Sequence, residues 1–102
     1  MSKCYVFAYG TLLDSKVRFD ILDYPTVLIK SSVTGFKPEE ILLSGRSYPI
    51  LIEDIQRQEK ISGGYFEINE SDIKKLDDYE SAAYRRKLTH TSDGVTVWIY
   101  FR

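Results

Sequence analysis

Six residues near the start of the chain, CYVFAY (residues 4–9), limit what the protein can fold into. A half-buried strand alternates apolar and polar side chains, whereas this run is apolar at both sets of alternating positions. The pattern is typical of a strand that is covered on both faces. We therefore predict that the chain starts with a central strand of a sheet that has packed layers on both sides.

The rest of the chain predicts short helices and strands. Helical spacing of apolar residues predicts two helices, over 14–24 and 69–80, with Asp14 or Ser15 capping the first and Asn69 or Ser71 the second. β-branched and alternating runs predict strands over 26–36, 40–45, 48–54 and 60–68, and a closing hairpin over 84–102 that turns at Asp93 and Gly94.

Two features within the strands carry positional meaning. Pro49 has no N–H to donate, so it should lie at the start of its strand or on a sheet edge. The Gly63-Gly64 pair predicts either a bulge or a place where another backbone approaches closely. Together the elements predict an α+β fold with a mostly antiparallel, strongly curved sheet or small barrel. The 102 residues allow one modest core, so we expect a single domain over 1–102.

Composition narrows the class of partner. The chain has 14 basic and 15 acidic residues without a basic run, which gives no electrostatic reason to expect nucleic-acid or membrane binding. The single cysteine, Cys4, is interpreted as a core residue that has no disulfide partner, and His90 as an exposed strand residue near the hairpin turn. We expect a cytoplasmic protein without a metal site or cofactor, whose partner is a small molecule or a protein.

One carboxylate falls on the apolar face of the second helix. With Ile73 at 0° and about 100° per residue, Leu76 lies near 300° and Glu80 near 340°. An acid in that position is buried, which raises its pKa toward the value that suits a general base near neutral pH. The alternative is that the helix ends by Tyr79 and Glu80 pairs at the surface with one of the arginines that follow.

The loop after the first strand is a second candidate. In FAYGTLL (residues 7–13), a buried strand ends in Gly10 and Thr11, and successive N–H groups of such a loop can bind a carboxylate or an oxyanion. Gly10 would also let a ligand approach the main chain closely. A single Gly-Thr pair is equally compatible with an ordinary turn that ends a strand, and it lacks the further glycines of a P-loop or dinucleotide site.

Several segments together resemble the γ-glutamylcyclotransferase-like family, which includes AIG2-like proteins and γ-glutamylamine cyclotransferases. These segments are FAYGTLL, SYPILI, ISGGYFEI, LDDYESAAYRRKL and VTVWIYF, and the resemblance spans nearly the whole chain. It implies a small curved sheet that closes into a barrel and is flanked by one to three short helices. It also implies a pocket between the loop after the first strand and a catalytic glutamate.

Carried over residue by residue, the resemblance implies that Glu80 is the catalytic glutamate and general acid/base. The substrate-binding residues that it implies are Tyr9, Gly10, Thr11 and Leu12 in the loop and Tyr84 downstream of the glutamate. The expected reaction converts a γ-glutamyl amine or peptide to 5-oxoproline and releases the amine, without metal or cofactor. The loop amides could bind the substrate α-carboxylate, which we favour, or the oxyanion.

Two features depart from the family pattern. Ser81 stands where many members have Gly after the glutamate, and the segment 80–84 is short beside that of many members. Both lie at the rim of the expected pocket, so they bear on the substrate more than on the fold. The alternative function is a non-catalytic small-molecule-binding or interaction protein on the same scaffold.

Overall fold

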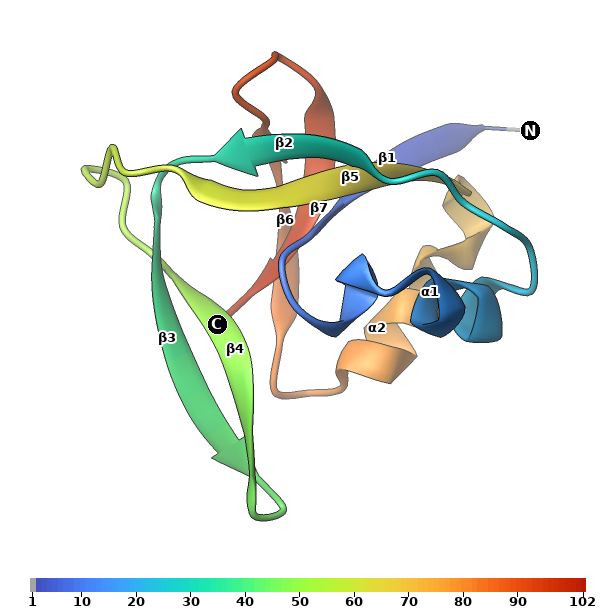
Figure 1. Cartoon of the computed structure of the whole chain (residues 1–102), viewed down its shortest axis with the longest axis horizontal. Helices are drawn as coiled ribbons and strands as arrows, with labels where there is room; N and C mark the ends of the chain where they lie inside the picture. The colour runs from blue at the N-terminus through green and yellow to red at the C-terminus, as the bar shows by residue number, and fades with distance from the viewer. Residues whose placement is uncertain (1) are drawn as a thin grey trace.

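The computed structural model describes residues 2–102 (Figure 1). In chain order the elements are β1 (Lys3–Ala8), the 3-10 turn η1 (Thr11–Leu13), α1 (Ser15–Leu22), β2 (Ile29–Val33), β3 (Phe36–Leu43), β4 (Arg46–Glu53), β5 (Ile61–Asn69), the 3-10 turn η2 (Glu70–Asp72), α2 (Ile73–Glu80), β6 (Arg85–His90) and β7 (Thr96–Phe101). The fold is α+β, as the sequence predicts.

The first strand lies in the middle of a five-stranded sheet with the order β2-β5-β1-β7-β6. It pairs antiparallel with β5 and parallel with β7, and the other neighbours in the sheet are antiparallel. The prediction of a central strand and of a mixed, mostly antiparallel sheet is confirmed. The C-terminal hairpin β6–β7 is also confirmed, with Gly94 at a positive φ of 88° in its turn.

Both faces of this sheet are covered, which explains the double apolar pattern of the first strand. On one face Val6 and Ala8 pack with residues of α1 and α2, including Leu22 and Leu76. On the other face Phe7 packs with a second cluster, whose members include Val33, Phe36, Leu51, Val97, Ile99 and Phe101. Figure 1 shows α1 and α2 together at one side of the sheet and the β3–β4 hairpin projecting at another.

The glycine pair of β5 marks a close approach of backbones rather than a bulge. Gly64 pairs with Ala8 and with Lys30 in ladders whose register is continuous. A Cβ on Gly63 would lie 2.1 Å from the carbonyl oxygen of Ala8, and one on Gly64 would lie 2.8 Å from the carbonyl oxygen of Ile29. Side chains at these two positions would push β5 away from its neighbours.

The sequence assignment is wrong over residues 26–45. The single strand expected over 26–36 is two strands, because Gly35 takes a positive φ of 87° and sends the chain from the main sheet into the β3–β4 pair. Of the strand expected over 40–45, residues 40–43 are the second half of β3, which begins at Phe36, and Ser44 and Gly45 form the turn into β4. Pro49 lies within β4, and it is tolerated there because β4 pairs only with β3 in the two-stranded sheet.

Helix boundaries match the sequence more closely than their caps do. Asp14 caps α1 by accepting a hydrogen bond of 2.8 Å from the N–H of Lys16, as expected. At the second helix, Asn69 instead accepts a hydrogen bond from the ammonium of Lys3 and makes no cap. The chain enters that helix through η2, so the cap expected from Asn69 or Ser71 is not made.

The two sheets meet where the ends of β4 and β7 come together. The N–H of Arg102 donates a hydrogen bond of 2.9 Å to the carbonyl of Leu51, which joins the C-terminal end of β7 to β4. Within residues 2–102, no continuous strand ladder closes the ring into a barrel. None of the helices described is long and apolar enough to cross a membrane.

Candidate active site

Glu80 is the last residue of α2, and its side chain lines a narrow cavity of about 30 Å³. The loop after β1 forms the opposite wall, β4 contributes Tyr48 and Pro49, and β7 contributes Tyr100. Glu80 therefore faces inward, on the side of α2 that the helical projection gives. The surface alternative does not hold, because Arg86 binds Asp77 and Arg85 lies over the ring of Phe101.

The carboxyl of Glu80 has no counter-charge in the part of the chain that the structure describes. No hydrogen bond or ion pair to it is found within residues 2–102, and the neighbouring side chains in the cavity are apolar or neutral. Burial therefore disfavours the carboxylate and raises the pKa of Glu80 to about 7. A carboxyl group in this state can both accept and return a proton near neutral pH.

The loop after β1 turns through η1, which is closed by hydrogen bonds to two of its carbonyls. The carbonyl of Gly10 accepts a hydrogen bond of 3.0 Å from the N–H of Leu13, and the carbonyl of Thr11 accepts one of 3.1 Å from Asp14. In the described part of the chain, the N–H groups of Gly10, Thr11 and Leu12 have no backbone or side-chain acceptor. These three residues line the same cavity as Glu80.

A buried arginine stabilises this loop through hydrogen bonds. Arg18 of α1 is only 3% exposed, and its Nη1 donates to the carbonyls of Leu12 (3.0 Å) and Leu13 (2.9 Å). Its Nε donates to the hydroxyl of Thr26 at 2.7 Å, and the guanidinium lies over the ring of Phe66. The sequence reading placed Arg18 in a helix without a role, because its partners are backbone carbonyls that no side-chain motif reveals.

Two tyrosines proposed as substrate contacts lie at the site, but their hydroxyls donate hydrogen bonds to backbone carbonyls. The hydroxyl of Tyr9 donates a hydrogen bond of 2.6 Å to the carbonyl of Tyr100. The hydroxyl of Tyr84 donates one of 3.0 Å to the carbonyl of Pro49. Burial, followed by the nearby Glu80 carboxylate, raises the pKa of both phenols.

A wider hollow of about 260 Å³ adjoins the narrow cavity. The two share Thr11, Tyr48 and Glu80, so the carboxyl of Glu80 stands where they meet. The remaining walls of the hollow are Leu43 and Ser44 at the β3–β4 turn, Tyr79 in α2, and Ser81 and Tyr84 after the end of α2. The hydroxyls of Thr11 and Tyr79 form a hydrogen bond of 2.7 Å across it.

All the residues proposed from the sequence therefore meet at one place. Glu80, Tyr9, Gly10, Thr11 and Leu12 line the narrow cavity, while Tyr84 lines the wider hollow and not the narrow cavity. Sequence reasoning did not assign site positions to Tyr48, Pro49 and Tyr79. Tyr48 and Pro49 belong to the segment SYPILI, which contributed to the family resemblance. That resemblance was the signal from which their place in the site could have been predicted.

The remaining candidates lie away from this site. Cys4 is half-buried against the first core cluster, and burial raises the pKa of its thiol. His90 is exposed at the end of β6. Within residues 2–102, no group of three or more His, Cys, Asp or Glu side chains is arranged to hold a metal ion.

Comparison with known proteins places this arrangement in a family. A family model described as gamma-glutamyl cyclotransferase, AIG2-like, matches residues 6–102, which is nearly the whole chain. The chain belongs to the gamma-glutamyl cyclotransferase, AIG2-like family. The resemblance stated from the sequence is thereby confirmed.

The chain is similar in sequence to a curated protein and in fold to several solved structures. The chain is 30% identical over 101 residues to AIG2-like protein C of Arabidopsis thaliana, covering 93% of this chain and 56% of that protein. A solved gamma-glutamyl cyclotransferase is 14% identical with a TM-score of 0.75, covering 98% of this chain and 66% of that one. An AIG2-like protein from Mus musculus is 20% identical with a TM-score of 0.78, covering 100% and 78%.

These gamma-glutamyl cyclotransferase-like relatives are longer than the chain. It spans little more than half of the Arabidopsis protein and about two thirds of the solved gamma-glutamyl cyclotransferase. At identities of 14% and 20%, the structural likeness shows a shared fold. The chemistry of this member has to be argued from its own site.

Proposed function

We propose that the protein is a γ-glutamyl cyclotransferase that converts a γ-glutamyl amine or peptide to 5-oxoproline. The α-amine of the substrate attacks its own γ-carbonyl carbon, and the new C–N bond closes a five-membered ring. The bond from that carbon to the leaving nitrogen then breaks, and the amine departs. Because nucleophile and carbonyl belong to one molecule, much of the proximity advantage is present once the protein binds the folded rotamer.

Glu80 carries the proton transfers in this proposal. The α-ammonium gives up two protons in becoming the ring N–H. Glu80 accepts each in turn, passes one to the leaving nitrogen, and releases the other to solvent, which restores the carboxylate. The observation that supports this role is the unpaired carboxyl of Glu80, with a pKa raised to about 7, facing the loop of residues 10–12. General acid/base catalysis of this kind contributes roughly 10²–10⁴-fold to the rate.

The loop amides are proposed to bind the negative charge of the substrate. The N–H groups of Gly10, Thr11 and Leu12 are without acceptors in the described chain, and they line the wall opposite Glu80. We assign them to the substrate α-carboxylate, which is charged throughout the reaction. That leaves the α-ammonium pointing toward Glu80. Tyr9 and Tyr84 are proposed as contacts that shape the two sides of the bound γ-glutamyl group.

The wider hollow is proposed to receive the departing amine. Because the hollow adjoins the narrow cavity at Glu80, the leaving nitrogen can pass the same carboxyl that activated the nucleophile. The leaving group can extend past the β3–β4 turn, where the hollow opens to solvent.

A turnover assay tests this function. The purified protein is incubated with a panel of γ-glutamyl amines and peptides, and 5-oxoproline is measured by mass spectrometry. We expect product with the wild type and none above background with Glu80→Gln, which keeps the shape of the side chain and cannot ionise. Glu70→Gln at the exposed start of η2 is the matched control and should retain full turnover. Absence of 5-oxoproline from every substrate would contradict the proposal.

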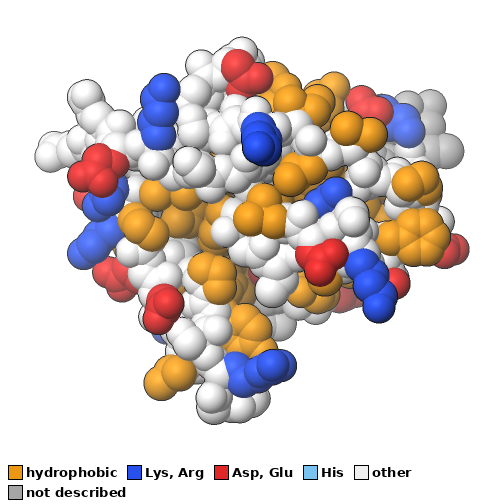
Figure 2. Space-filling view, viewed as in Figure 1, with side chains coloured by type: hydrophobic (Ala, Val, Ile, Leu, Met, Phe, Trp, Pro, Cys, Tyr) orange, Lys and Arg blue, Asp and Glu red, His pale blue; other side chains and the backbone are white. Residues whose placement is uncertain are grey.

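The second candidate is a small-molecule-binding protein without turnover. The observation that favours it is the narrowness of the cavity, about 30 Å³ between the tyrosine side chains and Glu80. A nucleic-acid binder has no such support, because charges of both signs are interspersed on the face drawn in Figure 2 and no basic stripe crosses it. Binding of a γ-glutamyl compound without release of 5-oxoproline would establish the second candidate.

A further inference from the structure

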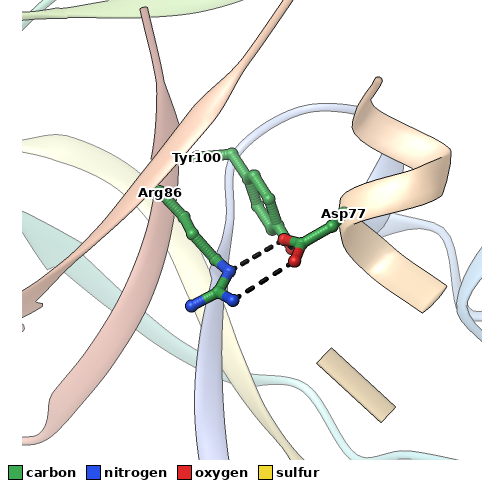
Figure 3. A network of polar contacts seen from close by, with 3 residues as sticks. All are labelled: Asp77, Arg86 and Tyr100. Carbon is green, nitrogen blue, oxygen red and sulfur yellow. Dashed lines mark hydrogen bonds and ion pairs between the residues drawn. The ribbon is translucent and has the colours of Figure 1, made fainter. Parts of the chain in front are cut away.

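Helix α2 carries two carboxylates one turn apart in opposite surroundings. Asp77 accepts hydrogen bonds from Nε (2.8 Å) and Nη2 (3.2 Å) of Arg86 and from the hydroxyl of Tyr100 (2.7 Å) (Figure 3). Glu80, three residues later, has no such partner in the described chain. Side chains three apart on a helix are neighbours, with Cβ atoms about 5–6 Å apart. Arg86 therefore binds the carboxylate that lies one helical turn before Glu80.

The two carboxyl groups differ accordingly in protonation. Burial alone would raise the pKa of Asp77, but the hydrogen bonds from Arg86 and Tyr100 outweigh it and hold that pKa below its ordinary value. Glu80 is also buried, but in the described chain it has no hydrogen-bond partner that would offset the effect of burial on its pKa. A pair of carboxyls whose surroundings push their pKa values apart is the arrangement by which active sites separate a charged group from a proton carrier.

Every cation on the strand beside α2 is already engaged. The guanidinium of Arg86 lies over the ring of Trp98 at 4.2 Å in addition to binding Asp77. Its neighbours in β6 have other partners: Arg85 lies over the ring of Phe101, and Lys87 forms an ion pair with Glu53. Asp78, the next residue of α2, is exposed, so if Asp77 lost its charge the next carboxylate on the inner side of the helix would be Glu80.

The other groups that face Glu80 are neutral phenols. They come from every element around the cavity, namely Tyr9 after β1, Tyr48 in β4, Tyr79 in α2, Tyr84 before β6 and Tyr100 in β7. The ring of Tyr100 lines the cavity of Glu80 while its hydroxyl binds Asp77. It therefore stands between Glu80 and the Asp77–Arg86 ion pair.

We propose that Asp77 is a positioning residue that holds the guanidinium of Arg86 away from Glu80, so that the carboxyl of Glu80 keeps no cationic partner. An arginine beside a carboxylate typically lowers its pKa by about one to three pH units, which would make Glu80 a weak base at neutral pH. The consequence for catalysis rests on the proposed function. The arrangement of charges does not, and it can be measured directly.

The test is an NMR titration of the Glu80 carboxyl in the whole protein, with ¹³C-labelled glutamate. Asp77→Asn releases Arg86 toward Glu80, so Glu80 should titrate about one pH unit or more below the wild type. Arg86→Met leaves the charge of Asp77 unopposed one turn away, so Glu80 should titrate above the wild type. Arg86→Lys keeps a cation beside Asp77 and should restore the wild-type midpoint to within about half a pH unit.

Opposite shifts separate this role from a merely structural one. If the network only stiffened the site, Asp77→Asn and Arg86→Met would both move Glu80 toward the ordinary carboxyl range, and that result overturns the proposal. So does a Glu80 midpoint that neither variant moves. Arg85→Met is the matched control on the adjacent residue and should leave the titration of Glu80 unchanged. If Arg86→Met does not fold, Arg86→Gln removes the same positive charge and should also raise the midpoint of Glu80 above that of the wild type.

Turnover measured in parallel keeps the two proposals apart. Where the wild type produces 5-oxoproline, the acid limb of kcat/KM should move in the same direction as the Glu80 midpoint in each variant. If no variant or wild-type sample produces 5-oxoproline, the proposed function fails while the titration still tests the role of Asp77. If 5-oxoproline is produced but the Glu80 midpoints do not shift in the expected directions, the proposed role of Asp77 is wrong and the proposed function still stands.

Discussion

The ring of Pro49 packs directly on Gly10, leaving no room there for a side chain. A Cβ built on Gly10 would lie 2.9 Å from Cγ of Pro49, although φ of Gly10 is an ordinary −132°. Glycine is needed here because β4 approaches the loop closely, rather than because of a left-handed backbone. This contact fixes the distance between two walls of the cavity that Glu80 closes.

Gly10→Ala should therefore widen the gap between the loop and β4. We expect it to destabilise the fold by about 1–3 kcal/mol, the usual cost of overpacking, and to raise KM more than it lowers kcat. Urea unfolding and steady-state kinetics measure the two effects. Pro49→Ala in the same chain should relieve most of the cost, and a double variant no better than Gly10→Ala would show that the contact does not act as described.

Ser81 closes α2 in a conformation that favours glycine. Its φ is 67° and its ψ is −175°, a region that residues other than glycine populate at a cost of about 1–3 kcal/mol. Ser81→Gly should raise the free energy of unfolding by about 1 kcal/mol. Asp23→Gly is the matched comparison, since Asp23 has φ 66° and ψ 27°, where Asp is tolerated, and its gain should be smaller. Equal gains in urea unfolding would contradict this reading.

Helical periodicity could locate Glu80 from the sequence, and the same rotation could have located Asp77. Asp77 lies at about 40° on the projection that puts Glu80 near 340°, so both acids face inward. The difference between them comes from Arg86 and Tyr100, which reach the helix from β6 and β7. Because strand pairing brings these residues in from elsewhere in the chain, helical position alone could not distinguish a bound carboxylate from an unpaired one.

The fold was predictable where the side-chain pattern is strong and local. The doubly apolar run of residues 4–9 identified the central strand, and Asp93 and Gly94 identified the last hairpin. The path of the chain through residues 26–45 was not predictable, for two reasons. The exposed residues KPEE of β3 have no alternating pattern, and the change from one sheet to the other depends on the backbone conformation of Gly35. The contact of Pro49 with Gly10 joins segments that only the folded chain brings together.

Arg18 should be as important for the loop as any residue that lines the cavity. Arg18→Met removes the donors to the buried carbonyls of Leu12 and Leu13, which should cost about 2–4 kcal/mol of unfolding free energy. Arg18→Lys should recover only part of this, because one ammonium cannot reproduce the planar guanidinium. Urea unfolding measures the effect, and Lys16→Met on the exposed side of α1 should stay within about 0.5 kcal/mol of the wild type.

The raised pKa of Glu80 also predicts how stability depends on pH. The folded protein keeps the proton of Glu80 up to about pH 7, whereas the unfolded chain loses it near 4.5, so the folded state binds more protons between these values. Stability should therefore fall as pH rises through that window. Glu80→Gln should be more stable than the wild type at pH 8 by about 1–3 kcal/mol, with no difference at pH 4.

Urea unfolding at the two pH values measures this difference. Asp78→Asn, on the exposed side of α2, is the control and should show no comparable gain at pH 8. A Glu80→Gln variant that is equally stable, or less stable, at pH 8 would mean that the native protein does not disfavour the ionised carboxylate.

The pH dependence of turnover tests the central claim most directly. With the best γ-glutamyl substrate, kcat/KM of the wild type should rise with pH along a limb centred near 7, where Glu80 loses its proton, and Glu80→Gln should show no turnover at any pH. A rate that stays level down to pH 5, or a Glu80→Gln variant that keeps the wild-type rate, would contradict the assignment of Glu80 as the general base.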